Sequence, residues 1–360
     1  MPEIWLNYGK TDIVLDIRAE NLDQKLDSQG KSLDDPKIGE KLASLDLSKQ
    51  MELVVLNNSK SVQKTISTVF DKCEQKSLAK PKILAEGSIL SNLKSVFPEG
   101  ITLSEFNDDT LSNSSLVFVG EMELDGLFGF ETIATRLIKK FGNDQMLTAY
   151  QQRKGDLPAP GEIIDNMQIA KKFVDSFEIM GIEIIANQNG IVDLSIGHPS
   201  STMTISKQFG EFSTKQVEKH RTMMISTGKD ASNDTLRRSL SSLWNCSRAL
   251  KDDGLAVLLA ECKNGIGSEA IHQFIEGRMS LERLKRPAKY VDGMEDLLFL
   301  TEIQKKFQIG LVSILPEFYT KKLNIVSFAG IKRAMDYILK NQGIKQKVAV
   351  VSDGARILIR

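Results

Sequence analysis

The sequence has few of the residues from which metal and nucleophilic sites are commonly built. Its 360 residues include only 3 histidines and 3 cysteines. The histidines are His198, His220 and His272, and the cysteines are Cys73, Cys246 and Cys262. No two histidines are close enough in sequence to suggest paired ligands, and the cysteines lack metal-knuckle spacing. An odd number of dispersed cysteines also argues against a disulfide framework and favours a reducing compartment.

The sequence also lacks an excess of charge and any long apolar run. Lys and Arg together number 47, as do Asp and Glu, so the formal net charge is zero. This balance gives no reason to expect a broad basic surface that binds a nucleic acid or a membrane. No apolar run approaches the roughly 20 residues of a membrane helix. The opening MPEIWLNYGKTDIVLDI carries early charges and no apolar signal-peptide region. We expect a cytoplasmic protein without nucleic-acid or membrane partners.

Short apolar runs rich in β-branched residues alternate with longer stretches of helical spacing. The expected strands are 13–17, 53–56, 82–85, 115–120, 182–186, 223–226, 255–260, 309–314 and 348–351. The expected helices include 60–75, 163–179, 233–251 and 330–340. Alternation of this kind predicts an α/β fold with mainly parallel sheets flanked by helices. The length favours two domains.

The clearest unit spans 223–276. The strand MMIS leads to a helix beginning near Thr235, for which Asn233 or Asp234 is the expected cap. KDDG is expected to end this helix, with Gly254 at the left-handed C-cap position. The strand LAVLLAE, the loop CKNGIG and a second helix follow.

A charged stretch at 212–222 is the expected domain boundary. It separates an N-terminal domain, 1–213, from a C-terminal α/β domain, 222–345. The tail 346–360 is expected to pack on the first domain. The polar segment 21–50 is interpreted as a surface loop with some helix.

Two loops after predicted strands are candidate ligand contacts. The loop from Cys262 to Glu269 contains one G-x-G, and its backbone amides can bind an anion, although a tight strand-to-helix turn is the simpler explanation. Lys229, in the segment TGKD, either points at a ligand between the domains or is solvated. No nucleophile elbow is present.

Several segments together resemble the nickel-dependent lactate racemase family. They are LNYGKTDIVLDI, SLVFVGEMELDGLFGF, GDLPAPGEIIDNMQIAKKFV, GIEIIANQNGIVDLSIGHP, the whole of 226–277, PEFYTKKLNIVSFAGIKRAMDYI and VVSDGARILI. The resemblance covers nearly the whole chain and is most specific over 223–276. It implies a two-domain racemase fold. In active members of the family, a nickel-pincer nucleotide held covalently by a lysine racemises 2-hydroxy acids, two histidines exchange the α-proton and a further histidine ligates nickel.

The family's catalytic positions are replaced in this sequence. Ile89 stands at the first histidine position, Asp125 at the second and Thr135 at or near the cofactor lysine. Leu236 and Leu240 stand where the family has a tyrosine and a lysine on the first helix of its second domain. The absence of histidine before His198 holds in any register of the alignment. The resemblance therefore implies a diverged member without nickel-pincer catalysis, with no metal site and no cofactor.

The leading hypothesis is a protein that binds a small carboxylic or hydroxy acid between its domains, or that acts as a partner. A homo-oligomer or a complex with an active paralogue fits this hypothesis. The candidate ligand contacts are Asp125, Arg136, Lys229, Asp230, Asn264, Gly265 and Gly267. They lie on loops after strands or face the cleft from the first domain, where α/β proteins gather ligands.

Two alternatives involve catalysis. An active nickel-pincer-nucleotide-dependent 2-hydroxy-acid racemase or epimerase requires that relocated residues enter the cleft, for instance His198 or His220 with Lys139 or Lys140. A different enzyme class could use Asp125 without nickel.

Overall fold

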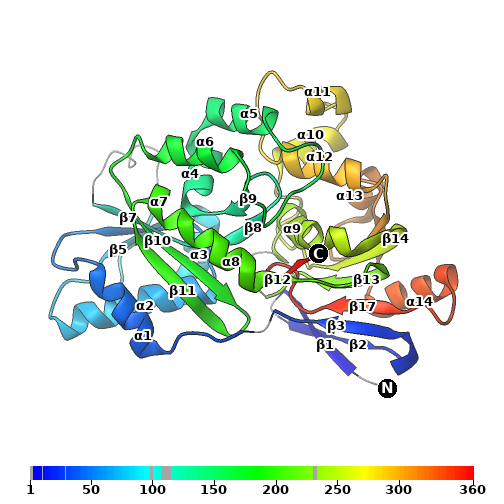
Figure 1. Cartoon of the computed structure of the whole chain (residues 1–360), viewed down its shortest axis with the longest axis horizontal. Coiled ribbons are helices and arrows are strands. Elements are labelled where there is room, and N and C mark those ends of the chain that lie inside the picture. The colour runs from blue at the N-terminus through cyan, green and yellow to red at the C-terminus, as the bar shows by residue number, and fades with distance from the viewer. Residues whose placement is uncertain (1–2, 10, 29, 98–99, 107–114, 230–232) are drawn as a thin grey trace.

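Two six-stranded sheets with surrounding helices organise the molecule (Figure 1). The computed structural model describes residues 3–9, 11–28, 30–97, 100–106, 115–229 and 233–360. Parallel pairing dominates both sheets, so the predicted α/β class with flanking helices is confirmed. In the described ranges, no helix is both long enough and apolar enough to cross a membrane.

The first sheet has the strand order β11-β10-β7-β4-β5-β6 and is parallel except for the hairpin β10–β11. Its strands are β4 (Glu52–Val55), β5 (Lys82–Ala85), β6 (Leu103–Glu105), β7 (Leu116–Glu121), β10 (Met180–Asn187) and β11 (Gly190–Gly197). One face packs against α1 (Asp35–Lys41), α2 (Lys60–Gln75) and α3 (Gly87–Lys94). The other packs against α4 (Ile133–Phe141), α5 (Asn143–Gln151), α6 (Asn166–Val174) and α8 (Ser206–Ser213). Burial on both faces explains why its central strands are continuous apolar runs.

The second sheet has the order β16-β15-β14-β13-β17-β3 and is wholly parallel. Its strands are β3 (Leu22–Leu26), β13 (His220–Ser226), β14 (Leu250–Leu259), β15 (Gln308–Val312), β16 (Val326–Phe328) and β17 (Val348–Val351). One face packs against α9 (Leu236–Cys246), α10 (Glu269–Ile275), α11 (Leu281–Lys285) and α12 (Met294–Ile303). The other packs against α14 (Ile331–Gln342) and the hairpin of β1 (Glu3–Tyr8) and β2 (Thr11–Asp16). Further elements are α7 (Pro199–Thr202), α13 (Glu317–Lys322) and the short pair β8 (Glu123–Asp125) and β9 (Gly129–Glu131).

The chain crosses between the two halves more than once. The N-terminal strand β3 pairs with β17, so the first residues lie with the second sheet (Figure 1). After β17 the chain returns toward the first sheet, and β18 (Leu358–Ile359) pairs with β12 (Thr214–Lys215). The division of the chain into the domains 1–213 and 222–345, with the tail 346–360 packed on the first domain, stays a prediction. We call residues 30–213 the first half and the rest of the chain the second half.

The local structure differs from expectation in three places. The segment 21–50, expected as a surface loop with some helix, also contains β3, which pairs with β17. The helix expected over 233–251 ends at Cys246, and Gly254 lies in β14 rather than at a C-cap. The register of β13 against β14 shifts there, because an irregularity accommodates Asp253 at φ 59°. The cap of α9 is Thr235, whose side chain accepts a hydrogen bond from the Arg238 amide, and neither Asn233 nor Asp234.

Candidate functional site

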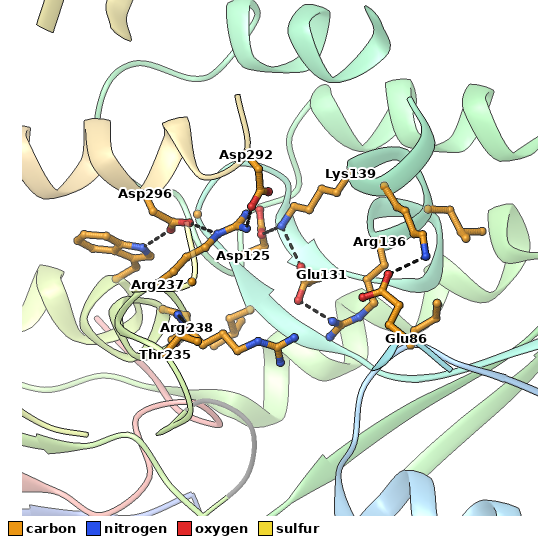
Figure 2. Close-up of a pocket in the computed structure, with 18 residues that line it drawn as sticks. Glu86, Asp125, Glu131, Arg136, Lys139, Thr235, Arg237, Arg238, Asp292 and Asp296 are labelled. Carbon is orange, nitrogen blue, oxygen red and sulfur yellow. Dashed lines mark hydrogen bonds and ion pairs between the residues drawn. The ribbon is translucent and has the colours of Figure 1, made fainter. Parts of the chain in front are cut away.

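A cavity of about 510 Å³ lies between the two halves, and we call it the inter-sheet cleft (Figure 2). From the first half it is lined by Leu56 after β4, Glu86 after β5, and residues of β8, β9 and α4. From the second half it is lined by the first turns of α9 and by Gly267, Asp292 and Asp296. The cleft thus lies outside the carboxyl ends of strands, where open α/β sheets bind ligands.

Helix α4 presents three cations to the cleft. Thr132 caps the helix, and its side chain and that of Thr135 form a reciprocal capping box. The apolar residues of α4 are buried against the first sheet and α6. The helical repeat therefore turns Arg136, Lys139 and Lys140 toward the cleft.

These cations are paired with carboxylates. Lys139 Nζ lies 2.5 Å from Asp125 Oδ2 and 2.9 Å from Glu131 Oε1. Arg136 bonds Glu123 at 2.5 Å and Glu131 at 3.0 Å. Burial opposes the charge on Lys139, but the two neighbouring carboxylates outweigh it and raise the pKa of its ammonium group. Burial likewise disfavours an ionised Glu131, yet Arg136 and Lys139 hold the pKa of that carboxyl well below its usual range. Lys140 bonds Glu86 at 2.7 Å.

The opposite wall carries a second ionic cluster, centred on Arg237. Its guanidinium bonds Asp292 at 2.6 Å, Asp296 at 2.9 Å and Glu295 at 3.2 Å. Trp244 Nε1 donates to Asp296 at 3.0 Å. Burial raises the pKa of Glu295 to about 7, although Arg237 opposes that shift. One arginine among three carboxylates thus rigidifies this wall.

Arg238 is the cation of the cleft lining that takes no part in the ion pairs described above. Its side chain is exposed and reaches from α9 into the cleft, with no hydrogen bond or ion pair to the other residues drawn (Figure 2). Thr235, Arg238 and Ser241 follow one another at three-residue spacing, so they share the cleft-facing side of α9. A guanidinium in this setting is suited to a carboxylate, which it can bind through two parallel hydrogen bonds.

The structure brings three of the seven candidate ligand residues into the cleft. Asp125, Arg136 and Gly267 line it. Gly267 has φ +69°, and a Cβ there would lie 2.6 Å from Thr235, so glycine allows its loop to pack on the start of α9. The carboxylate of Asp125 accepts from Lys139 and from the amides of Leu127 and Phe128.

Other candidates lie elsewhere. Lys229 pairs with Asp12 of the N-terminal hairpin at 3.0 Å. Asn264 and Gly265 belong to the loop that bonds the start of α9, where the Gly265 carbonyl accepts from the Leu236 amide. None of these three is among the described lining residues of the cleft. Asp230 lies outside the described residues. Whether any of the seven binds a ligand stays a prediction.

The residues at the replaced catalytic positions are mostly buried. Thr135, Leu236 and Leu240 have no exposed surface, and Ile89, a residue of α3, packs in the core of the first half. Among these positions, only Asp125 lines the cleft in the described structure.

All three histidines of the chain are in the described structure, and each lies away from the cleft lining. His198 bonds the Phe177 carbonyl at 3.0 Å and Ser200 at 2.8 Å. His220 bonds Asp23 at 2.8 Å, and His272 packs edge-on against Tyr319. Each imidazole therefore has a local structural role.

The cleft does not fit the nickel-pincer nucleotide of the resembled family. That group needs a lysine for covalent attachment and a histidine for nickel. Lys139 and Lys140 line the cleft, but both are ion-paired, and the raised pKa of Lys139 keeps its amine protonated and non-nucleophilic. In the described residues, no group of three or more His, Cys, Asp or Glu side chains could hold a metal ion.

Comparisons with known proteins bear on the fold. No protein-family model matches the sequence, and no curated protein matches it. The solved structure of the lactate racemase apoprotein from Thermoanaerobacterium thermosaccharolyticum is similar, with a TM-score of 0.72 and 16% identity over 100% of both chains. A protein from Thermotoga maritima is similar with a TM-score of 0.65 and 10% identity, over 92% of this chain and 99% of that one. The chain therefore has the fold of lactate racemase over its whole length.

Proposed function

We propose that this chain is a diverged relative of lactate racemase that binds a small carboxylic or hydroxy acid in the inter-sheet cleft without nickel-pincer catalysis. The observation that carries the proposal is Arg238, the lining cation without an ion pair among the residues drawn in the cleft. The other lining cations have their charge neutralised by adjacent carboxylates. A carboxylate ligand gives Arg238 the directly bonded anionic partner that the other lining cations already have.

The size and polarity of the cleft also favour a small polar ligand. Its volume of about 510 Å³ lies within the range of small-molecule sites. With the carboxylate of the ligand on Arg238, Ser241 one turn further along α9 lies beside the rest of the molecule. Its hydroxyl is suited to a hydroxyl group of the ligand.

Calorimetric titration with lactate, glycolate and acetate tests the proposal. We expect at least one of these acids to bind and the Arg238→Ala variant to bind it at least tenfold more weakly, because a charge-assisted pair is lost. Arg333→Ala, which removes an exposed arginine of α14 far from the cleft lining, serves as the control. No binding by the wild type, or equal affinity in the Arg238→Ala variant, would refute the proposal.

The alternative is an active nickel-dependent racemase with relocated residues. Lys139 and Lys140 line the cleft, as this alternative requires, whereas His198 and His220 do not. Co-expression with the nickel-nucleotide biosynthetic enzymes, followed by metal analysis and intact mass, separates the two. We expect an unmodified mass and no stoichiometric nickel. An added cofactor mass with one nickel per chain would establish the racemase instead. Association with an active paralogue stays a prediction, which co-purification tests.

A further inference from the structure

A second cavity, of about 370 Å³, opens between the two halves, and we call it the Phe307 pocket. It is lined by Leu157 and Pro158 of the first half and by residues of the second half around Phe307. The resemblance implies no catalytic or binding role for these residues, and the proposed function does not use them. The volume is within the range of pockets that hold small molecules.

The floor of the pocket is apolar. Leu250, Ile303 and Phe307 are buried in the core of the second half, and they present one side to the pocket. Leu157 and Pro158 close it from the first half, and Leu157 keeps 38% of its surface exposed. A large aliphatic side chain exposed at the mouth of a cavity gains from contact with an apolar ligand.

The rim of the pocket is cationic. It carries the exposed side chains of Lys219, Arg248 and Lys306 against one carboxylate, that of Asp252. Arg248 is ion-paired with Glu162, which lies outside the pocket lining. The rim therefore has an excess of positive charge around a hydrophobic floor. The complementary ligand has an apolar body and a single negative charge.

We propose that the Phe307 pocket is a binding site for a small aromatic monocarboxylate. The ring lies on Leu250, Ile303 and Phe307, and the carboxylate is held between Lys219 and Lys306. An aromatic body is favoured because Phe307 and Pro158 both line the pocket and offer flat apolar contact surfaces.

The two cavities are separate but share a wall. Helix α9 contributes Ser241 and Trp244 to the inter-sheet cleft, while Ser247 and Arg248, which follow it, line the Phe307 pocket. The Ala159 amide bonds the Gly126 carbonyl at 2.9 Å, which joins the loop of Pro158 to a cleft-lining residue. Any test must therefore distinguish binding in the pocket from binding in the cleft.

Phenylacetate is the probe, with neutral phenylacetamide as its isostere, and titration calorimetry measures both. We expect phenylacetate to bind at least tenfold more tightly than phenylacetamide. In the double variant Lys219→Glu/Lys306→Glu we expect at least a tenfold loss of phenylacetate affinity. The double variant Lys332→Glu/Lys345→Glu makes the same charge change at exposed positions outside both cavities and should bind as the wild type does.

The Arg238→Ala variant identifies the cavity. Phenylacetate bound in the Phe307 pocket is unaffected by this change, whereas a ligand of the cleft is lost. Equal affinity for the amide and the acid, an unaffected Lys219→Glu/Lys306→Glu variant, or loss of binding in Arg238→Ala would each overturn the proposal. Thermal melts confirm that every variant is folded before it is titrated.

Discussion

Glu183 lies in β10 with no exposed surface, and its carboxylate accepts from the Ile133 amide at 3.0 Å. Burial raises the pKa of this carboxyl from 4.5 to about 8, although the bond from Ile133 opposes the shift. The folded state therefore binds a proton that the unfolded chain releases between these pH values. The free energy of unfolding should fall as pH rises from about 4.5 through 8, and the loss should level off above that.

Glu183→Gln keeps an oxygen that accepts from Ile133 but cannot ionise. As pH rises from 5 to 9, we expect the free energy of unfolding of Glu183→Gln to increase relative to that of the wild type by on the order of a few kcal/mol. Urea denaturation at each pH measures this difference. Glu218→Gln, at an exposed position, is the matched control and should follow the wild type. Parallel pH curves for wild type and Glu183→Gln would contradict this account.

Gly129 is constrained by a close backbone approach. It has φ +82°, and a Cβ there would lie 1.9 Å from the Glu162 carbonyl oxygen. We expect Gly129→Ala to lower the free energy of unfolding by at least about 3 kcal/mol, because the strand must move and the backbone is strained. Gly155→Ala has a similar φ of +88° with open space around it, so it should cost only about 1 kcal/mol. Chemical denaturation of both variants measures the difference.

At the residue scale, part of the cleft lining could be predicted from the local sequence. Asp125, Arg136 and Gly267 were predicted near a ligand and do line the cleft. Lys229 was misplaced there, because its partner Asp12 comes from a hairpin more than two hundred residues earlier. Arg238 was missed, although its three-residue spacing from the helix cap at Thr235 was a usable signal. The absence of an ion pair between Arg238 and the other residues drawn in the cleft becomes visible only once the two halves are brought together.

At the scale of elements, the segment after β17 joins the two halves. Arg356 bonds Glu121, at the end of β7, through Nε at 3.1 Å and Nη2 at 2.9 Å. Ser59 donates to the other carboxylate oxygen of Glu121 at 2.5 Å. The side chain of Glu121 is only 3% exposed. A buried carboxylate that loses its cation is strongly destabilising.

We therefore expect Arg356→Ala to lower the free energy of unfolding by about 3–5 kcal/mol, measured by denaturant titration. Adding Glu121→Gln to this variant should recover part of the loss, because the unpaired charge is removed. Arg278→Ala breaks an exposed pair with Glu276 and should cost less than about 1 kcal/mol. A loss for Arg356→Ala no larger than that for Arg278→Ala would show that the buried pair contributes little.

Most elements of the fold were predictable because periodicity is a local property. Each predicted strand overlaps an observed one, and α2 has the predicted bounds 60–75. Strand β3 was missed because LDQKL is largely exposed and polar and is a strand only through its pairing with β17. The end of α9 was misjudged because KDDG forms the irregular start of a strand, which depends on the register against β13.

At the scale of the whole molecule, the second sheet draws on both ends of the sequence. Residues 222–345 lack both β17 and β3, and without β17 the strand β13 loses one of its neighbours. We expect a fragment of residues 222–345 to show no cooperative thermal transition. The fragment 30–213 keeps all six strands of the first sheet and should melt cooperatively. Circular dichroism melts test both, and a cooperative melt of 222–345 would disprove the dependence on β17.

The pairing of β3 with β17 also orders events during synthesis of the chain. Val348 follows Leu26 by 322 residues, so at about 5–20 residues per second the partner of β3 leaves the ribosome roughly 15–65 s later. During that interval the first half completes its strands, whereas Leu6, Leu15 and Ile17 of the N-terminal segment lack the complete sheet that later buries them. This apolar segment therefore waits for its complete partner sheet until almost the whole chain has been made.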